Sequence, residues 1–138
     1  MNKDHRLSSA IHILAGLEFS GKINSKVFAL SLKTNPALIR RLLAQLSRAK
    51  LVVCEKGKGG GSRLARSPGK ITIKHIYLAL GKDHIFGSFD KQPYKKCPVS
   101  CSIKTALDFL YQEIESAMLR KMDRITLEDV IKTMKLKT

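Results

Sequence analysis

Tryptophan is absent from the 138 residues of this chain, and aromatic residues are few, with five Phe and three Tyr. Aliphatic side chains must therefore fill any core. Hydrophobic residues make up 43% of the chain, which is enough for one compact domain or one small domain with an appendage. This composition excludes a disordered or a fibrous protein.

Long apolar runs are lacking as well. The apolar stretch at residues 13–17 is short and has polar residues on both sides, so we expect neither a signal sequence nor a membrane span. We therefore expect a cytoplasmic protein. Cysteines number three, and in a reducing cytosol we expect no structural disulfide among Cys54, Cys97 and Cys101.

Acidic residues are scarce. The chain has 11 Asp and Glu against 26 Lys and Arg, a net charge of +15. Residues 1–70 carry 14 basic and 3 acidic side chains, whereas residues 71–138 carry 12 and 8. Such an excess attracts polyanions, either nucleic acid or an anionic membrane surface, so the first half is the predicted anion-binding half. The alternative is a solvated basic surface that serves solubility.

Catalytic signatures are also lacking. We find no paired carboxylates, no Ser/His/Asp set and no Cys/His set, and the four histidines are scattered without partners at metal-ligand spacing. The sequence therefore predicts a protein that is not an enzyme and has no metal site.

Hydrophobic spacing predicts an α-rich first half with one β-hairpin. We expect helices over 6–19, 25–32, 36–49 and 71–80, and strands over 51–55 and 62–65. Ser25 is the expected cap of the second helix, and Asn35 followed by Pro36 is a strong start for the third. The polar residues of the third helix, expected on its outer surface, are Arg40, Arg41, Gln45 and Arg48.

The second half is predicted to be a loop followed by a long helix. Residues 82–99 lack periodicity, whereas apolar residues over 102–124 recur at steps of four and three, as in a coiled-coil seam. Thr126 is expected to cap a last short helix. We therefore divide the chain into a DNA-binding domain (1–81), a loop or linker (82–101) and a dimerisation region (102–138). The predicted dimer contacts are Ile103, Leu107, Leu110, Ile114, Ala117 and Met118.

The helix-turn-helix followed by a hairpin is typical of winged-helix DNA-binding domains, in which one helix enters the major groove. An ordinary three-helix bundle with a basic face is the alternative. The glycine-rich loop at 56–61 lies between strands and lacks the Gly-Lys-Ser/Thr of a nucleotide-binding P-loop, so it fits a wing, or else a plain hairpin tip. Candidate DNA contacts are Ser25, Lys26, Asn35, Pro36, Ala37, Arg40, Arg41, Lys56, Lys58, Gly60, Gly61 and Arg63.

Two segments carry a family resemblance. Residues 35–52 and the wing Gly57-Lys58-Gly59-Gly60-Gly61 followed by Ser62-Arg63-Leu64-Ala65-Arg66 resemble the Rrf-two family of bacterial winged helix-turn-helix regulators. The resemblance implies a mainly α fold with a small β-hairpin, and a homodimer in which the long C-terminal helix packs against its partner. It also implies sequence-specific binding of duplex DNA, and we favour a repressor.

An RNA-binding or ribosome-associated basic protein is the alternative function. Modules that read single-stranded RNA present aromatic stacking platforms. The basic segments of this chain lack interleaved aromatic residues, which favours duplex DNA.

The loop cysteines raise the question of a cofactor. Several members of the family bind an iron–sulphur cluster through three cysteines in this loop, but here the loop has two, Cys97 and Cys101. Cluster iron is usually held by four thiolates, so we expect no cofactor. The alternatives are a cluster completed by His84 or by the other subunit, a redox-active thiol pair, and inert thiols. Pro98 argues against helical geometry before Cys101.

Overall fold

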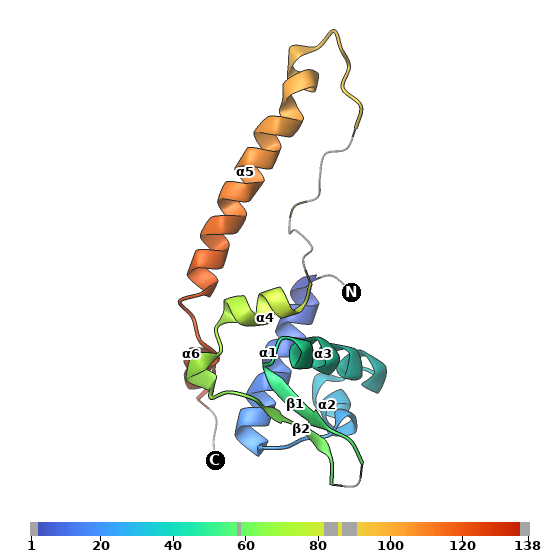
Figure 1. Cartoon of the computed structure of the whole chain (residues 1–138), viewed down its shortest axis with the longest axis vertical. Coiled ribbons are helices and arrows are strands. Elements are labelled where there is room, and N and C mark those ends of the chain that lie inside the picture. The colour runs from blue at the N-terminus through green and yellow to red at the C-terminus, as the bar shows by residue number, and fades with distance from the viewer. Residues whose placement is uncertain (1–2, 58, 82–85, 87–90, 136–138) are drawn as a thin grey trace. The chain divides into compact units, whose positions relative to one another are not determined.

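The structure is a computed structural model that describes residues 3–57, 59–81, 86 and 91–135 (Figure 1). The described residues form two compact units. The larger unit draws on residues 1–82 and 122–138, and the smaller unit on residues 83–121.

Three helices begin the larger unit: α1 (Lys3–Ser20), α2 (Ser25–Leu32) and α3 (Pro36–Arg48). The cap of α2 differs from our prediction, because Asn24 rather than Ser25 precedes the helix and its side chain accepts the N–H of Val27 at 3.0 Å. Asn35 caps α3 as predicted, and its side chain accepts the N–H of Leu38 at 2.8 Å. The turn between α2 and α3 begins at Lys33, whose φ of 53° ends α2 in the left-handed region.

The predicted hairpin is formed by β1 (Val52–Glu55) and β2 (Gly61–Leu64), which pair antiparallel with Glu55 opposite Gly61. Ile23, which lies between α1 and α2, extends the hairpin by one residue. It exchanges both backbone hydrogen bonds with Ser62, at 3.3 and 3.2 Å. The wing is therefore attached to the loop that precedes α2.

The larger unit is completed by a 3-10 turn η1 (Pro68–Lys70), α4 (Ile73–Ala79) and α6 (Leu127–Met134). The segments before α4 and α6 pair through 2.8 Å backbone hydrogen bonds from Ile73 to Ile125 and from Leu127 to Ile71. We expected residues 102–138 to form one region, but this pairing and the burial of Leu127 place α6 in the larger unit.

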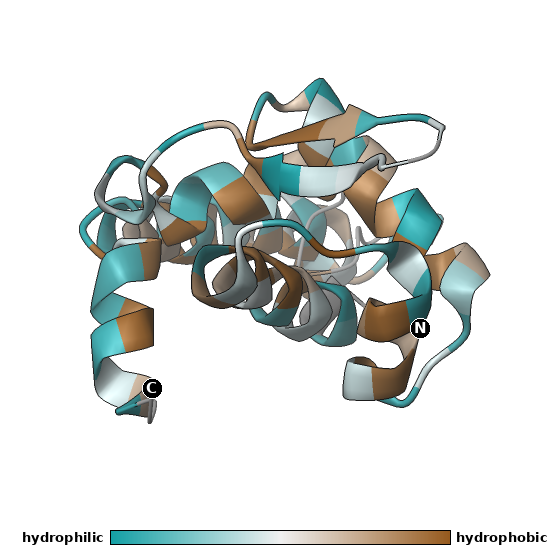
Figure 2. Ribbon diagram, turned by 90° about the horizontal axis from the view of Figure 1, so that it is seen from below, coloured by the Kyte–Doolittle hydropathy of each residue, from teal (hydrophilic) through white to brown (hydrophobic). Residues whose placement is uncertain are grey.

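Aliphatic side chains fill the core of the larger unit, as the composition predicts. Figure 2 shows apolar and polar segments alternating along the helices. The largest fully buried side chains of the core are Ile13, Leu14, Leu17, Phe28, Ile39, Leu42, Leu46, Leu51, Ile71, Ile76, Leu80 and Leu127.

The smaller unit consists mainly of α5 (Pro98–Met122), whose last residue belongs to the larger unit. The helix begins four residues earlier than predicted, and the Cys101 N–H bonds the Cys97 carbonyl at 3.1 Å. Our expectation that Pro98 argues against helical geometry before Cys101 is therefore wrong. Proline is tolerated at the first helical position because an N–H there would have no partner within the helix. Among the described residues, no helix combines the length and apolar character that crossing a membrane requires.

Candidate nucleic-acid interface

The starts of α2 and α3 are both suited to anions. Neither helix has an acidic residue in its first turn. The first N–H groups of a helix have no partner within the helix, and they carry partial positive charge. Asn35 and Ala37 at the start of α3 are exposed, so a phosphate or a base edge can approach the backbone there.

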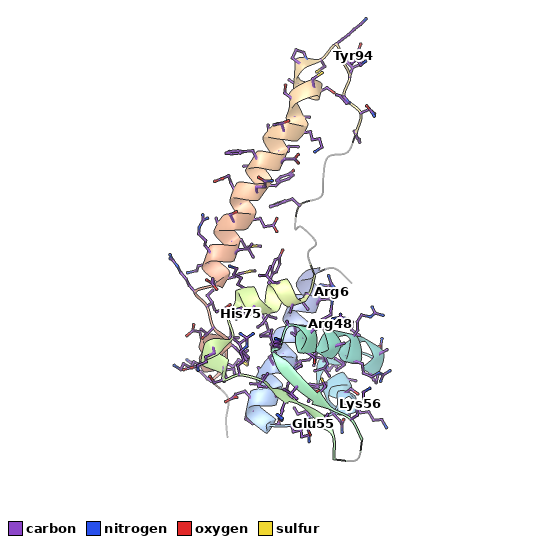
Figure 3. The ribbon with its side chains drawn as sticks, in the orientation of Figure 1. Arg6, Arg48, Glu55, Lys56, His75 and Tyr94 are labelled. Carbon is purple, nitrogen blue, oxygen red and sulfur yellow. The ribbon has the colours of Figure 1, made fainter. Side chains whose placement is uncertain are left out.

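One face of α3 is buried and the other carries arginines. Arg40 and Arg41 are exposed in the middle of the helix. Arg48, which Figure 3 labels, is exposed in its last turn. Gln45, expected on the outer surface, is instead half-buried and donates to the carbonyl oxygen of Leu80 at 3.3 Å. It therefore connects α3 to the end of α4.

The wing depends on its glycines. Gly57 and Gly59 have φ of 89° and 77°, which side-chain-bearing residues rarely adopt. A Cβ on Gly60 would collide with the carbonyl oxygen of Glu55 and lie 2.8 Å from that of Gly57. The described backbone of the loop therefore needs glycine at these positions.

A groove of about 620 Å³ separates the wing from the helices of the helix-turn-helix. Of the candidate DNA contacts, the structure brings together Ser25, Arg40, Lys56, Gly60 and Gly61 along its walls. Five other candidates lie outside this lining but remain wholly or partly exposed, namely Lys26, Asn35, Pro36, Ala37 and Arg41. Lys58 lies outside the described residues.

The electrostatics of the wing centre on Glu55, which also lines the groove (Figure 3). Its carboxylate accepts a hydrogen bond from the Lys22 ammonium at 3.1 Å and lies 3.3 Å from the guanidinium of Arg63. The hydrogen bond and charge of Lys22, followed by the charge of Arg63, lower the pKa of Glu55 below its ordinary value. The candidate Arg63 is thus paired with a carboxylate rather than presented alone.

Sequence reasoning missed Lys22, Asn24 and Glu55. One signal could have found the last of these, because Glu55 is the only acidic residue between Glu18 and Asp83. A single acidic residue in so basic a stretch indicates a specific role for its charge. Lys22 gives no such signal, since its contact with Glu55 depends on the pairing of Ile23 with Ser62.

Arg66, just after the wing, has a different task from the candidate DNA contacts. Its guanidinium lies 3.3 to 3.5 Å from the carbonyl oxygens of Lys50, Ala49 and Lys70. These hydrogen bonds provide partners for backbone carbonyl groups at the end of α3 and in the turn η1. Within the Leu64-Ala65-Arg66 sequence, Arg66 therefore has a structural role.

The predicted dimer contacts lie on α5. No residue of this helix is buried within the described structure. Leu110 and Ile114 are 47% and 43% exposed, and the neighbouring Phe109 is 67% exposed. Phe86 covers part of the helix by stacking on Tyr111, with ring centroids 4.6 Å apart.

The cysteines make local contacts. Cys97 Sγ accepts the N–H of Ser100 at 3.4 Å, and Cys101 Sγ lies 3.6 Å from the carbonyl oxygen of Tyr94. Cys54 belongs to the other unit, where its thiol lies 3.3 Å from the hydroxyl of Ser62. Across the described residues, no three His, Cys, Asp or Glu side chains group as metal ligands would.

Comparison with known proteins decides the family. The model of the Rrf2 family, described as an iron-dependent transcriptional regulator, matches residues 4–133. The chain belongs to the Rrf2 family. It is a winged-helix, DNA-binding transcription regulator rather than an enzyme, as the sequence resemblance predicted.

Individual relatives agree with this assignment. The chain is 32% identical over 126 residues to YwnA of Bacillus subtilis (strain 168), a candidate HTH-type transcriptional regulator, and the match covers 91% of this chain and 94% of YwnA. The crystal structure of a candidate DNA binding protein is 31% identical with a TM-score of 0.74, over 91% of this chain and 98% of that one. T. potens IscR shares the fold at 22% identity, with a TM-score of 0.67 over 100% and 91% of the two chains.

Because the family is described as iron-dependent, an iron centre in this chain would need suitable donor side chains. The loop offers two thiols, and the Cys101 thiol can donate to the Tyr94 and Lys95 carbonyl oxygens at 3.6 and 3.8 Å. A cluster usually needs four thiolates. The donors among the described residues therefore do not fit an iron–sulphur cluster.

Proposed function

We propose that this Rrf2-family regulator is a homodimeric repressor that binds a two-fold symmetric duplex operator in the cytoplasm. The observation that carries the proposal is the groove between α2, α3 and the wing, lined by Arg40 and Lys56 and flanked by two helix starts without acidic residues. A winged helix uses these parts for DNA, with one helix in the major groove and the wing beside it.

Within this groove we assign different contacts to different elements. Arg40 faces the groove from α3 and is our candidate for base edges, since arginine can donate two hydrogen bonds to guanine. Phosphate contacts are assigned to Lys56, Lys58 and the helix starts at Ser25, Lys26, Asn35, Pro36 and Ala37. Such contacts set register without reading sequence.

The homodimer is assigned to α5. Its exposed apolar side chains, Phe109, Leu110 and Ile114, are those a second copy would cover. An interface between identical copies of one surface is two-fold symmetric, so the operator half-sites should be related by the same axis. Repression then requires only that the dimer occupy DNA that the transcription machinery needs.

Selection of bound duplexes from a random pool tests this function. We expect recovery of one sequence with two inverted half-sites about one helical turn apart, because each winged helix reads one half-site. Recovery of no consensus, together with tighter binding to double-stranded RNA in a gel shift, would favour the RNA-binding alternative.

We also predict that the protein holds no stable iron–sulphur cluster. The reason is the pair of loop thiols where a cluster needs more ligands. Anaerobically purified protein is expected to be colourless. A brown protein with stoichiometric iron and sulphide would contradict this prediction.

A further inference from the structure

One carboxylate sits among the cations of the wing. Glu55 ends β1 and binds two side chains at once, with Lys22 Nζ 3.1 Å from Oε2 and Arg63 Nη2 3.3 Å from Oε1. Lys22 precedes α2 and Arg63 belongs to β2, so three separate segments meet at this carboxylate.

The network is fixed to the backbone of the wing. Lys22 Nζ also donates to the carbonyl oxygen of Gly59 at 2.6 Å. The side-chain stem of Lys22 lies against Gly61, where an added Cβ would be 3.3 Å from Lys22 Cγ. The ammonium of Lys22 is therefore held against the backbone of the wing at Gly59 and does not extend freely toward a ligand.

Stability alone does not account for this network. The side chains of Lys22, Glu55 and Arg63 are 39%, 44% and 48% exposed, and ion pairs at such exposure contribute little to folding. Their position relates them to binding instead. Glu55 lines the groove together with Arg40 and Lys56, so a phosphate entering the groove meets a negative charge beside the positive ones.

We propose that Glu55 is a specificity-determining residue, which holds Lys22 and Arg63 in the wing and prevents them from contacting phosphates of arbitrary sequence. The inference rests on the proposed function. Each cation that neutralises a phosphate releases counterions and adds affinity that is independent of sequence. Pairing with Glu55 keeps two such cations in each subunit from contacting phosphates. Discrimination between DNA sequences is then left to α3.

Specificity depends on this restraint because binding to random duplex and binding to the operator respond differently to the release of Lys22 and Arg63. On random duplex no base contact holds the protein in one docked pose, so freed side chains can settle on whichever phosphates they reach. On the operator, base contacts hold one docked pose, and freed side chains reach only the phosphates near that pose. Releasing Lys22 and Arg63 therefore raises affinity for random duplex more than affinity for the operator.

The substitution Glu55→Gln tests the proposal, because it keeps the shape of the side chain and removes its charge. We expect the salt slope of log K on random duplex to steepen by about two to four units per dimer, at roughly 0.9 per newly contacted phosphate. Random-duplex affinity at low salt should rise roughly tenfold, with a smaller gain on the operator. The variant Glu55→Gln/Arg63→Gln should recover part of the wild-type slope.

Glu128→Gln is the matched control. Glu128 is also an exposed carboxylate in an ion pair, with Lys132 at 2.9 Å, but it lies on α6 and does not line the groove. An equal shift in slope for Glu128→Gln and Glu55→Gln would overturn the inference, because general charge would then explain the effect. An unchanged slope for Glu55→Gln would overturn it as well.

A second comparison does not require Glu55 to be replaced. Under the proposal Lys22 contacts no phosphate, whereas Lys56 does, so Lys22→Gln should leave the slope unchanged and Lys56→Gln should make it shallower by about two units per dimer. Equal losses for the two variants would overturn the inference. A wild-type protein that fails to bind any duplex would instead overturn the proposed function, and with it this inference.

Discussion

The two units of the chain differ in how much of their apolar surface they cover themselves. In the larger unit Ile13, Leu42 and Leu46 have no exposed surface, and side chains cap α2, α3, α4 and α6. In the smaller unit α5 buries none of its residues and exposes Phe109, Leu110 and Ile114. Each square ångström of exposed apolar surface costs about 25 cal/mol in water. The larger unit therefore has the core it needs to fold, whereas α5 has a surface that a partner would complete.

The largest expected effect comes from placing charges on the exposed apolar surface of α5. Leu110→Glu together with Ile114→Glu should give monomers, because two charges cannot be buried in an apolar interface without partners. Operator affinity should fall by about a hundredfold or more, since linked half-site binding is lost. Sedimentation and a gel shift measure the two effects.

The matched control replaces exposed polar residues of the same helix with the same charges, as in Gln112→Glu together with Ser116→Glu. These changes should leave the oligomeric state unaltered. A wild-type protein that sediments as a monomer at micromolar concentrations would contradict the assignment of the dimer to α5.

The next effect is on the folding stability of the larger unit rather than on its oligomeric state. Leu46→Ala should lower the free energy of unfolding by about 2–5 kcal/mol, because it leaves a cavity at a fully buried site. Denaturant unfolding followed by circular dichroism measures this change. Leu30, which is 80% exposed on α2, is the control, and Leu30→Ala should change stability by no more than about 0.5 kcal/mol.

The same measurement sharpens the comparison between the units. Leu110→Ala should lower the midpoint of unfolding in a way that depends on protein concentration, as expected for a residue that stabilises a dimer. Leu46→Ala should lower it at every concentration. Identical concentration dependence in the two variants would argue that the units do not differ as described.

The smallest expected effect is on recognition of the operator sequence rather than on folding. Arg40→Ala should cost about 1–3 kcal/mol of operator binding for each lost base contact and relax preference at one position in each half-site. Arg48, exposed in the last turn of α3 and outside the groove lining, is the control. A greater loss of specificity with Arg41→Ala would transfer the base contact to Arg41.

The elements of the larger unit were predictable because their signals are local. The apolar spacing and the turn signals predicted the end of α2 at Leu32, and Asn35 and Thr126 cap their helices as expected. Asn24 and Ser25 are adjacent and are both good caps, so the sequence could not choose between them. The backbone decides, since Asn24 is extended with φ −92° and ψ 164°.

The candidate site was predictable in part. Arg40, Lys56 and the wing glycines follow from composition and spacing, whereas the contacts of Lys22 and Gln45 depend on residues 33 to 37 positions away. Long-range pairing of this kind leaves no periodic trace in the sequence. The start of α5 was missed for a local reason, because proline both ends helices and begins them.

The pairing of the segments before α4 and α6 has a consequence for how the chain responds to cutting. Because Leu127 is buried and bonds Ile71, the C-terminal helix remains part of the larger unit without the covalent path through α5. A protease that cleaves once after the exposed Lys95 would therefore leave two fragments that stay associated through this pairing. Such a nicked protein should elute as one species from a sizing column and separate into two chains only in denaturant.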